Sequence, residues 1–184
     1  MKIIKNTILG ALAIALFMAC SDTKNSGTSE STSNLADTAK EKIEISNLLD
    51  SFNVAVANAD FDKYFNYYTE DAIFIGTDAT EHWDKKAFMA WAKPYFDSKE
   101  TWNFKSLKRH IYFGKHDDIA WFDELLDTQM KICRGSGVLV KVGEEWKVQQ
   151  YVLSMTIPND DLDAVLKIKS PKEDKLIQEL KSKK

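Results

Sequence analysis

Histidine and cysteine are scarce in this chain of 184 residues, which contains three histidines and two cysteines. Metal sites are commonly built from these residues at fixed spacings, such as His-x-His or a His-Glu-x-x-His helix, and neither spacing occurs here. The sequence also lacks internal repeats, a phosphate-binding loop and a dinucleotide-binding fingerprint. We therefore expect neither a metal site nor a bound cofactor.

Neither sign of charge predominates, because the chain has 25 basic and 28 acidic residues and a formal net charge of −3. This balance gives no reason to expect a nucleic acid partner. Hydrophobic residues make up 44% of the chain. That is the composition of a globular protein, and the length fits one domain with appendages.

The first twenty residues are organised like a secretory signal. Lys2 and Lys5 precede an apolar run over residues 8–19, which is shorter than the roughly 20 apolar residues that span a bilayer. Cys20 follows, and the sequence then turns polar. The segment resembles a bacterial lipoprotein signal, although Phe17 stands where that family usually has leucine.

The lipoprotein resemblance implies a signal peptide over residues 1–19 and a membrane anchor through lipidated Cys20. It places the protein at the cell envelope, facing the periplasm or the cell surface. Residues 20–35 lack apolar periodicity and predict a flexible tether. An ordinary signal cut nearby, or an uncleaved anchor, would instead leave Cys20 unmodified. We interpret Cys133 as a small buried side chain.

Apolar residues at helical spacing predict a long helix from about Ala36 to Ala59. Asp60 can cap a second, short helix that runs through Tyr68. A β segment over residues 72–78 follows.

Asp84 can cap a third helix, in which Pro94 predicts a kink or an early end. From Trp102 onward the period changes to two, which predicts strands. Short turns separate four such strands, at about 102–113, 117–130, 134–142 and 146–155. Short links imply antiparallel hairpins, so we predict an α+β fold with helices packed on one face of a curved antiparallel sheet.

Residues 159–184 predict a charged helical tail. Asn159 can cap a helix that Pro171 stops, and a second helical stripe follows. This lysine-rich tail is either a solvated helix or a segment that contacts a membrane surface.

Short segments between residues 38 and 158 carry a family resemblance through their order. They are YTEDA (68–72), FIGTD (74–78), EHW (81–83), PYF (94–96), RHIY (109–112), DIAWFDELLD (118–127), RGSGVL (134–139) and WKV (146–148). The ordered set resembles the SnoaL-like branch of the nuclear transport factor 2-like superfamily, with the domain over residues 36–158. The resemblance implies a conical fold that encloses a pocket, commonly in a homodimer formed through the outer face of the sheet.

The family does not imply one activity, since it includes isomerases, cyclases, dehydratases, hydrolases, immunity proteins and binding modules. In many relatives the last strand reads Trp-x-Ile-x-His-x-His-x-Ser. Here Gln150 and Val152 stand at the histidine positions, and neither can titrate near neutrality. Lys85 replaces a glycine that is usual before the third helix.

Asp123 and Glu124 lie in a predicted strand, where alternation places them on opposite faces and excludes a catalytic pair of the two. The acid that faces inward is a candidate general base with a raised pKa, or a structural partner of Arg109 or Arg134. His110 is a third candidate catalytic residue.

Aromatic side chains are the candidates for a ligand site, and their alternative use is a packed core. The wider set is Tyr64, Tyr67, Tyr68, Phe74, Trp91, Tyr95, Trp102 and Trp121. The residues predicted to contact a ligand are Tyr64, Tyr68, Phe74, Trp91, Trp102, Trp121 and Gln150. Gly135 and Gly137 predict a bulge or a close backbone approach rather than a nucleophile elbow.

The sequence thus favours a lipid-anchored domain that binds a small apolar or amphipathic molecule without catalysis. One alternative is an isomerase, dehydratase or hydrolase that uses a single pocket carboxylate as general base. The other is a protein-interaction module that acts through its sheet face. A desolvated acid in an enclosed cavity would favour the enzyme. An open cavity without titratable groups would favour the binding protein, and a cone filled by its own side chains would favour the interaction module.

Overall fold

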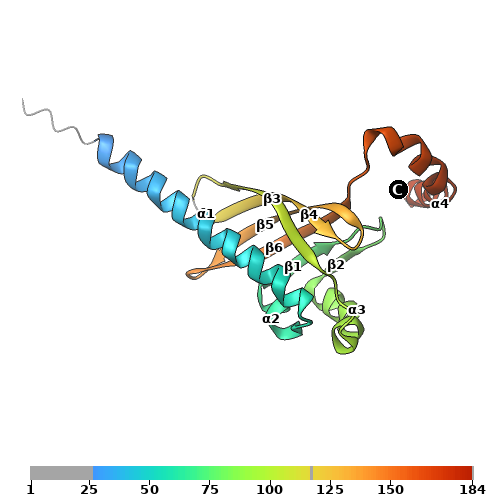
Figure 1. The fold of residues 1–184 in the computed structure, drawn as a ribbon, viewed down its shortest axis with the longest axis horizontal. Helices are drawn as coiled ribbons and strands as arrows, with labels where there is room; N and C mark the ends of the chain where they lie inside the picture. Colours follow the sequence, from blue (N-terminus) through green and yellow to red (C-terminus); the bar gives the residue numbers. More distant parts are fainter. Residues whose placement is uncertain (1–26, 117, 184) are drawn as a thin grey trace, which may run out of the picture.

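The computed structural model describes residues 27–116 and 118–183, with side chains from residue 38 onward. The predicted signal peptide over residues 1–19, the predicted lipidation site Cys20 and the start of the predicted tether lie outside the described residues. The elements follow in the order α1 (Gly27–Ala57), α2 (Phe61–Asn66), β1 (Tyr68–Ile75), β2 (His82–Asp84), α3 (Lys85–Ser98), β3 (Phe104–Phe113), β4 (Ile119–Thr128), β5 (Lys131–Val142), β6 (Glu145–Met155), the 3-10 turn η1 (Asn159–Asp161) and α4 (Leu162–Ser182) (Figure 1).

The strands form one six-stranded sheet in the order β2-β1-β6-β5-β4-β3. Every neighbouring pair is antiparallel except β1 and β6, which run parallel. The α+β fold is therefore confirmed, but the expectation of a wholly antiparallel sheet is wrong at this pair. Short turns reveal the direction of strands that follow one another in sequence. Between β1 and β6 lie all the elements from β2 to β5, so no turn reveals their direction.

Helix α1 crosses one face of the sheet diagonally (Figure 1). Ile45, Leu49, Phe52 and Val56 recur at three- and four-residue steps, and each is at most 1% exposed. Burial of such a side chain contributes about 1.5–3 kcal/mol, so this stripe holds the helix on the sheet.

The first helix begins at Gly27 rather than near Ala36. Residues 27–35, which were predicted to belong to the flexible tether, are helical in the structure. Apolar periodicity reports only the part of a helix that packs against a core, so it could not reveal this polar extension.

Helix α2 begins where the Asp60 side chain accepts a hydrogen bond from the Lys63 main-chain nitrogen at 3.2 Å, as the capping prediction requires. The helix ends at Asn66, and Tyr68 is the first residue of β1. The prediction that this helix runs through Tyr68 is therefore wrong. Tyr68 belongs to β1, and its side chain is buried in the core from that strand.

Helix α3 begins at the predicted cap, where Asp84 accepts a hydrogen bond from the Ala87 main-chain nitrogen at 2.7 Å. Pro94 does not end the helix, which continues to Ser98. Proline removes a single donor from the helical ladder. Phe96, two residues beyond it, is 4% exposed, so continued burial explains why the helix persists.

Strand β6 contains an irregularity that the sequence does not announce. Val148 pairs with Leu139 of β5, whereas Gln150 pairs with the next residue, Val138. Gln149 is therefore an extra residue in β6, as in a β-bulge. The bulge reverses which residues face the core for the rest of the strand.

After the bulge, Tyr151 and Leu153 face inward and are 2% and 6% exposed. Gln150 and Val152 alternate with them and belong to the opposite face. Without the bulge, alternation from Val148 would have placed Gln150 inward, as expected from the sequence.

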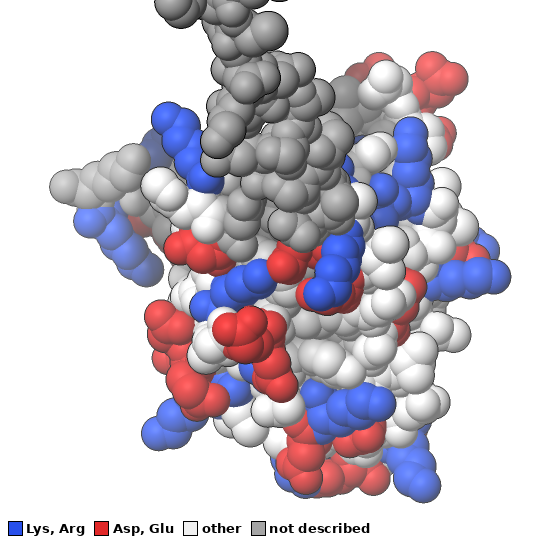
Figure 2. Space-filling model, turned by 90° about the vertical axis from the view of Figure 1, so that its left-hand side faces the viewer, with Lys and Arg blue, Asp and Glu red and all other residues white. Residues whose placement is uncertain are grey.

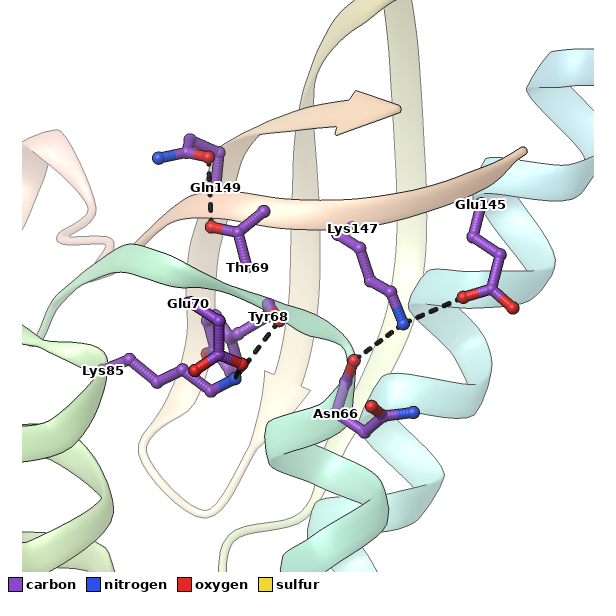
Figure 3. Close-up of polar contacts among 8 residues, drawn as sticks. All are labelled: Asn66, Tyr68, Thr69, Glu70, Lys85, Glu145, Lys147 and Gln149. Carbon is purple, nitrogen blue, oxygen red and sulfur yellow. Dashed lines mark hydrogen bonds and ion pairs between the residues drawn. The ribbon is translucent and has the colours of Figure 1, made fainter. Parts of the chain in front are cut away.

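Polar contacts fasten β1 to its neighbours (Figure 3). The Thr69 hydroxyl donates to Gln149 Oε1 at 3.0 Å, so the bulged residue also bridges two strands. Lys85 Nζ lies 2.8 Å from Glu70 Oε1 and 3.4 Å from the Tyr68 carbonyl oxygen. The lysine that replaces the usual glycine therefore joins the start of α3 to β1.

Gly135 and Gly137 of β5 lie where larger side chains from neighbouring strands fill the core. A Cβ atom at Gly135 would lie 2.5 Å from the Tyr151 hydroxyl and 3.2 Å from Glu124 Cγ. At Gly137 it would lie 2.8 Å from the Phe122 ring. The predicted close approach at these glycines is therefore confirmed, and no bulge interrupts the pairing of β5 with β4.

Helix α4 follows η1 and lies beyond the end of the sheet (Figure 1). Pro171 lies inside this single helix, so the prediction that it stops the helix is wrong. Asn159 begins the 3-10 turn rather than capping α4, whose N-cap is Asp161. Within the described residues, no helix has the length and apolar character needed to cross a bilayer.

Charged side chains of both signs alternate over the end of the molecule at which α1 begins. On that face, lysine and arginine are interspersed with aspartate and glutamate (Figure 2). The described residues visible on this face therefore form no extended surface of a single sign.

Candidate functional site

An aromatic cavity of about 240 Å³ lies between α2, α3 and the sheet. A water molecule occupies about 30 Å³ in the liquid, so the cavity has room for a small organic molecule. The lining residues are Tyr64, Phe74, Gly76, Thr77, Glu81, Phe88, Trp91, Tyr95, Trp102, Phe104, Met130 and Leu153. Seven of these twelve are aromatic, which gives the cavity an apolar wall with few polar groups.

The spacing of α3 directs one aromatic face toward the cavity. Phe88, Trp91 and Tyr95 follow one another at three- and four-residue steps, so they share one side of the helix. Trp102 reaches the cavity from the segment after α3, and Phe104 from the start of β3.

Ring stacking holds the cavity walls in place. The centroids of Phe74 and Phe88 are 3.9 Å apart with nearly parallel rings, and those of Trp91 and Trp102 are 5.4 Å apart. Trp83 stacks on Trp91 from outside the lining at 4.7 Å. Each such pair contributes about 0.5–1.5 kcal/mol beyond burial, so the wall is largely preformed.

Glu81 brings the only carboxylate to the lining. It lies in the loop between β1 and β2, where its Oε2 accepts a hydrogen bond from the Asp78 main-chain nitrogen at 3.1 Å. Gly76 donates its main-chain N–H to the Glu81 carbonyl oxygen at 3.0 Å. A Cβ atom at Gly76 would lie 2.1 Å from Glu81 Oε2, so the glycine leaves room for the carboxylate.

Tyr64 of α2 lines the cavity and is buried. Its hydroxyl oxygen lies 3.1 Å from the Tyr68 hydroxyl, within hydrogen-bonding distance. Burial raises the pKa of Tyr64 well above its usual value. The phenol therefore stays protonated near neutrality and can offer a hydrogen bond but no negative charge.

Glu124 is the acid of β4 that faces inward. It is 1% exposed, whereas Asp123 belongs to the opposite face and contacts His110 Nδ1 at 3.1 Å. Arg109 of β3 holds the buried acid, with Nε 2.9 Å and NH2 2.8 Å from Glu124 Oε2. Burial raises the pKa of Glu124, and the neighbouring guanidinium opposes this rise. Of the two partners considered for the inward acid, the structure therefore brings Arg109 to it.

Besides Arg109 NH2, which forms an ion pair with Glu124 Oε2 at 2.8 Å, three buried polar atoms have no hydrogen-bond partner among the described residues. They are Glu124 Oε1, the Tyr151 hydroxyl oxygen and Asn53 Oδ1. Burial raises the pKa of Tyr151 well above its usual value, and the Glu124 charge adds to the effect. None of these three residues lines the aromatic cavity. The buried acid and the cavity are therefore separate features of the cone.

The structure brings four of the predicted ligand-contacting residues together, namely Tyr64, Phe74, Trp91 and Trp102. Tyr68 does not line the cavity and is buried behind Tyr64, with its hydroxyl on the Tyr64 oxygen.

Trp121 and Gln150 were predicted to contact a ligand in the cone, and neither lines the aromatic cavity. Trp121 is 45% exposed on the outer face of β4 and stacks on Tyr112 at 5.9 Å, because the cone interior takes the alternate residues of that strand. Gln150 is turned outward by the bulge at Gln149. His110 belongs to the outer face as well, opposite Asp123.

Sequence reasoning missed Glu81, Phe88, Phe104, Met130 and Leu153, together with the loop residues Gly76 and Thr77. Two signals were present in the sequence. The loop residues belong to the FIGTD and EHW segments, and Phe88 lies on the same helical face as Trp91. The alternation of side chains in β6 could not predict that Leu153 faces the cavity, because the bulge at Gln149 sets which face its side chain lies on.

No group of His, Cys, Asp and Glu side chains within the described residues is arranged to hold a metal ion. The cavity lining contains one carboxylate and no histidine or cysteine. The chemistry that this arrangement supports is recognition of an apolar body, with a few polar groups to orient it.

Comparison with solved structures identifies similar folds. An NTF2-like protein of unknown function from Pseudomonas putida matches with a TM-score of 0.55 at 18% identity, over 66% of this chain and 90% of that chain. A protein of unknown function with a cystatin-like fold from Nostoc punctiforme matches with a TM-score of 0.54 at 15% identity, over 64% and 92%. An NTF2-like protein from Cytophaga hutchinsonii matches with a TM-score of 0.50 at 15% identity, over 61% and 95%. At these identities the matches show a shared fold only.

A search of curated proteins gives no match to this chain. The model of the SnoaL-like domain family matches residues 45–158. This segment is more than half of the chain and contains the helices and strands that form the aromatic cavity. The protein therefore belongs to the SnoaL-like domain family, within the NTF2-like fold.

Proposed function

We propose that the domain binds a small apolar or amphipathic molecule in its aromatic cavity. The observation that carries this proposal is the lining, in which seven of twelve residues are aromatic. The volume of about 240 Å³ lies just below the roughly 300–1,000 Å³ of pockets for drug-sized ligands. A ligand of one or two rings, or a short amphipathic chain, therefore fits the space best.

Binding without catalysis is favoured because the buried acid is occupied elsewhere. Glu124 is the strongest candidate base, but its carboxylate is already paired with the Arg109 guanidinium through Nε and NH2. A general base must come within hydrogen-bonding reach of the proton that it removes. Glu124 does not line the cavity, so the isomerase, dehydratase or hydrolase alternative cannot use it as the base; the one carboxylate of the lining, Glu81, accepts a hydrogen bond from the Asp78 main-chain nitrogen at 3.1 Å.

The test combines a trapped ligand with a filled cavity. Native mass spectrometry of the purified domain should detect a bound small molecule, and calorimetry should measure binding of a neutral probe such as indole. Met130→Trp should abolish binding, because Met130 lines the cavity from the turn between β4 and β5 and the larger ring would fill part of its volume. Trp121→Phe on the outer face is the matched control and should bind normally. If the wild-type domain is always empty and binds no apolar probe, the proposal is refuted.

We further propose that Cys20 is lipidated and anchors the domain at the cell envelope. The support is the sequence, in which an apolar run precedes Cys20 and a polar segment follows it. Cys20→Ala should move the protein from the membrane fraction to the soluble fraction. Unchanged fractionation of this variant would rule out the lipoprotein assignment.

A homodimer through the outer face of the sheet is proposed for the assembly. Tyr112, Ile119, Trp121 and Ile132 lie on β3, β4 and β5, and each is 44–48% exposed. Such an apolar area is typical of an interface. Trp121→Lys should convert a dimer to a monomer in sedimentation experiments, and a wild-type protein that sediments as a monomer at high concentration would contradict this proposal.

A further inference from the structure

The aromatic cavity has a charge that nothing in its lining balances. Glu81 is its only carboxylate, and the lining contains no lysine, arginine or histidine. Among the described residues, Glu81 takes part in no ion pair. Its known contact is the hydrogen bond from the Asp78 main-chain nitrogen to Oε2.

The loop holds the Glu81 carboxylate in a defined position. Three hydrogen bonds close this loop. The Gly76 N–H donates to the Glu81 carbonyl oxygen, the Glu81 N–H to the Asp78 carbonyl oxygen, and the Asp78 N–H to the side-chain oxygen Glu81 Oε2. A Cβ atom at Gly76 would lie 2.1 Å from Oε2, so a larger residue there would displace the carboxylate from this position. A fixed carboxylate loses little side-chain freedom when a ligand binds, which favours recognition.

An unbalanced carboxylate beside an apolar wall discriminates between ligands by charge. The Glu81 carboxylate attracts a cation and repels an anion, and because this side chain is only partly buried, solvent screens the attraction to that of a partly exposed ion pair. The Phe104 ring adds to this preference. Phe104 lines the cavity and pairs with no other ring in the described part of the chain. The face of an aromatic ring attracts a positive group.

We propose that the cavity selects a small organic cation, with an amine or quaternary ammonium head near Glu81 and an apolar body against the aromatic wall. This inference rests on the proposed binding function and names the chemical class of its ligand. The competing role for Glu81 is to close the loop through Oε2, which requires an acceptor oxygen but no charge. Charge and acceptor can therefore be separated by substitution.

The test uses two probes of the same shape. Benzyltrimethylammonium carries a quaternary nitrogen where neopentylbenzene carries a carbon, so they differ in charge and not in form. Wild-type domain, measured by calorimetry at low salt, should bind the cation at least about fivefold more tightly than the neutral probe, which is the effect of one partly exposed ion pair.

Glu81→Gln keeps an oxygen that can accept from Asp78 and removes the charge. This variant should bind the cation about fivefold more weakly and bind the neutral probe as wild type does. Glu179→Gln in α4 changes the net charge equally and should alter neither affinity. A thermal melt confirms that each variant is folded.

The outcomes separate this inference from the function on which it rests. If wild type binds both probes equally, or if Glu81→Gln leaves the preference intact, the cation inference is overturned while binding stands. If neither probe nor any other apolar compound binds wild type, the proposed function fails as well. The preference of wild type between the two probes decides the matter even if Glu81→Gln does not fold.

Discussion

Replacement of Arg109 by methionine tests whether the buried ion pair is a structural lock. Arg109 donates to the Ser46 carbonyl and hydroxyl oxygens at 2.9 Å, and lies 2.9 Å from Asp50 Oδ1. The same guanidinium reaches Glu124 Oε2 through two nitrogens. It thus joins α1 to β3 and β4. Methionine keeps the apolar stem and removes every one of these contacts.

The expected loss is dominated by Glu124, because its side chain has no exposed surface. Removal of one partner from a buried ion pair leaves an uncompensated charge and destabilises a protein by about 3–5 kcal/mol. The Asp50 side chain is 60% exposed, so its share is small after solvent screening. A change of this size lowers the melting temperature of a domain of this length by roughly 6–20 °C.

The loss should depend on pH. Burial raises the pKa of Glu124 above its ordinary value of 4.5, and Arg109 opposes this rise. A carboxyl with a raised pKa binds its proton more tightly in the folded state. Its contribution to stability is therefore greatest at low pH and is lost as the pH rises through the folded-state pKa. Without Arg109 that pKa rises further, so the variant should be least impaired in acid.

Urea unfolding followed by circular dichroism measures these free energies at pH 5 and pH 7.5. The deficit of Arg109→Met relative to wild type should be smaller at pH 5. Adding Glu124→Gln to this variant should recover much of the loss at pH 7.5, because no charge then remains buried. A deficit below about 1 kcal/mol, or one that does not change with pH, would refute the account of a desolvated acid held by Arg109.

Three further substitutions probe the packing around this centre and the start of α3. Gly135→Ala should destabilise the fold by about 1–3 kcal/mol in urea unfolding, because the added Cβ would lie 2.5 Å from the Tyr151 hydroxyl. The control Gly114→Ala should be close to neutral, because its Cβ would have its nearest contact at 3.4 Å. Tyr151→Phe should be neutral or stabilising in thermal melts because that hydroxyl has no partner among the described residues, whereas Tyr64→Phe should lose about 1 kcal/mol with its hydrogen bond. Asp84→Ala should lose about 1 kcal/mol of stability in the same melts with the cap of α3, and unchanged stability would show that the cap is dispensable.

Local periodicity predicted the parts of the fold that local contacts determine. The division of Asp123 and Glu124 between two faces followed from alternation, and it held because β4 pairs with β5 without a shift. The same rule failed in β6, where the extra residue Gln149 reverses which side chains face the core in the rest of the strand. A bulge depends on pairing with a neighbouring strand, so the sequence of β6 alone does not encode it visibly.

The candidate site was predictable to the extent that it lies on helix faces and strands without bulges. Trp91 and Phe74 could be chosen as aromatic residues of regular elements, and both line the cavity. Glu81 could not be chosen, because its importance comes from a loop that folds back on Gly76. A loop carboxylate has no period, so only its neighbours in space distinguish it from a solvated surface residue.

The separation of Glu124 from the cavity bears on how this fold is used. To act as a base, Glu124 would have to release Arg109 and reach a ligand that lies beyond Tyr151 and Phe74, whose rings are parallel and 6.1 Å apart. Release of the pair alone would require about 3–5 kcal/mol, before any cost of moving the rings. The Arg109–Glu124 ion pair that stabilises the fold therefore keeps the Glu124 carboxylate away from the cavity. The side chains that line the cavity are mainly aromatic rings, together with the Glu81 carboxylate. Such a set can hold a small molecule and select it by shape and charge.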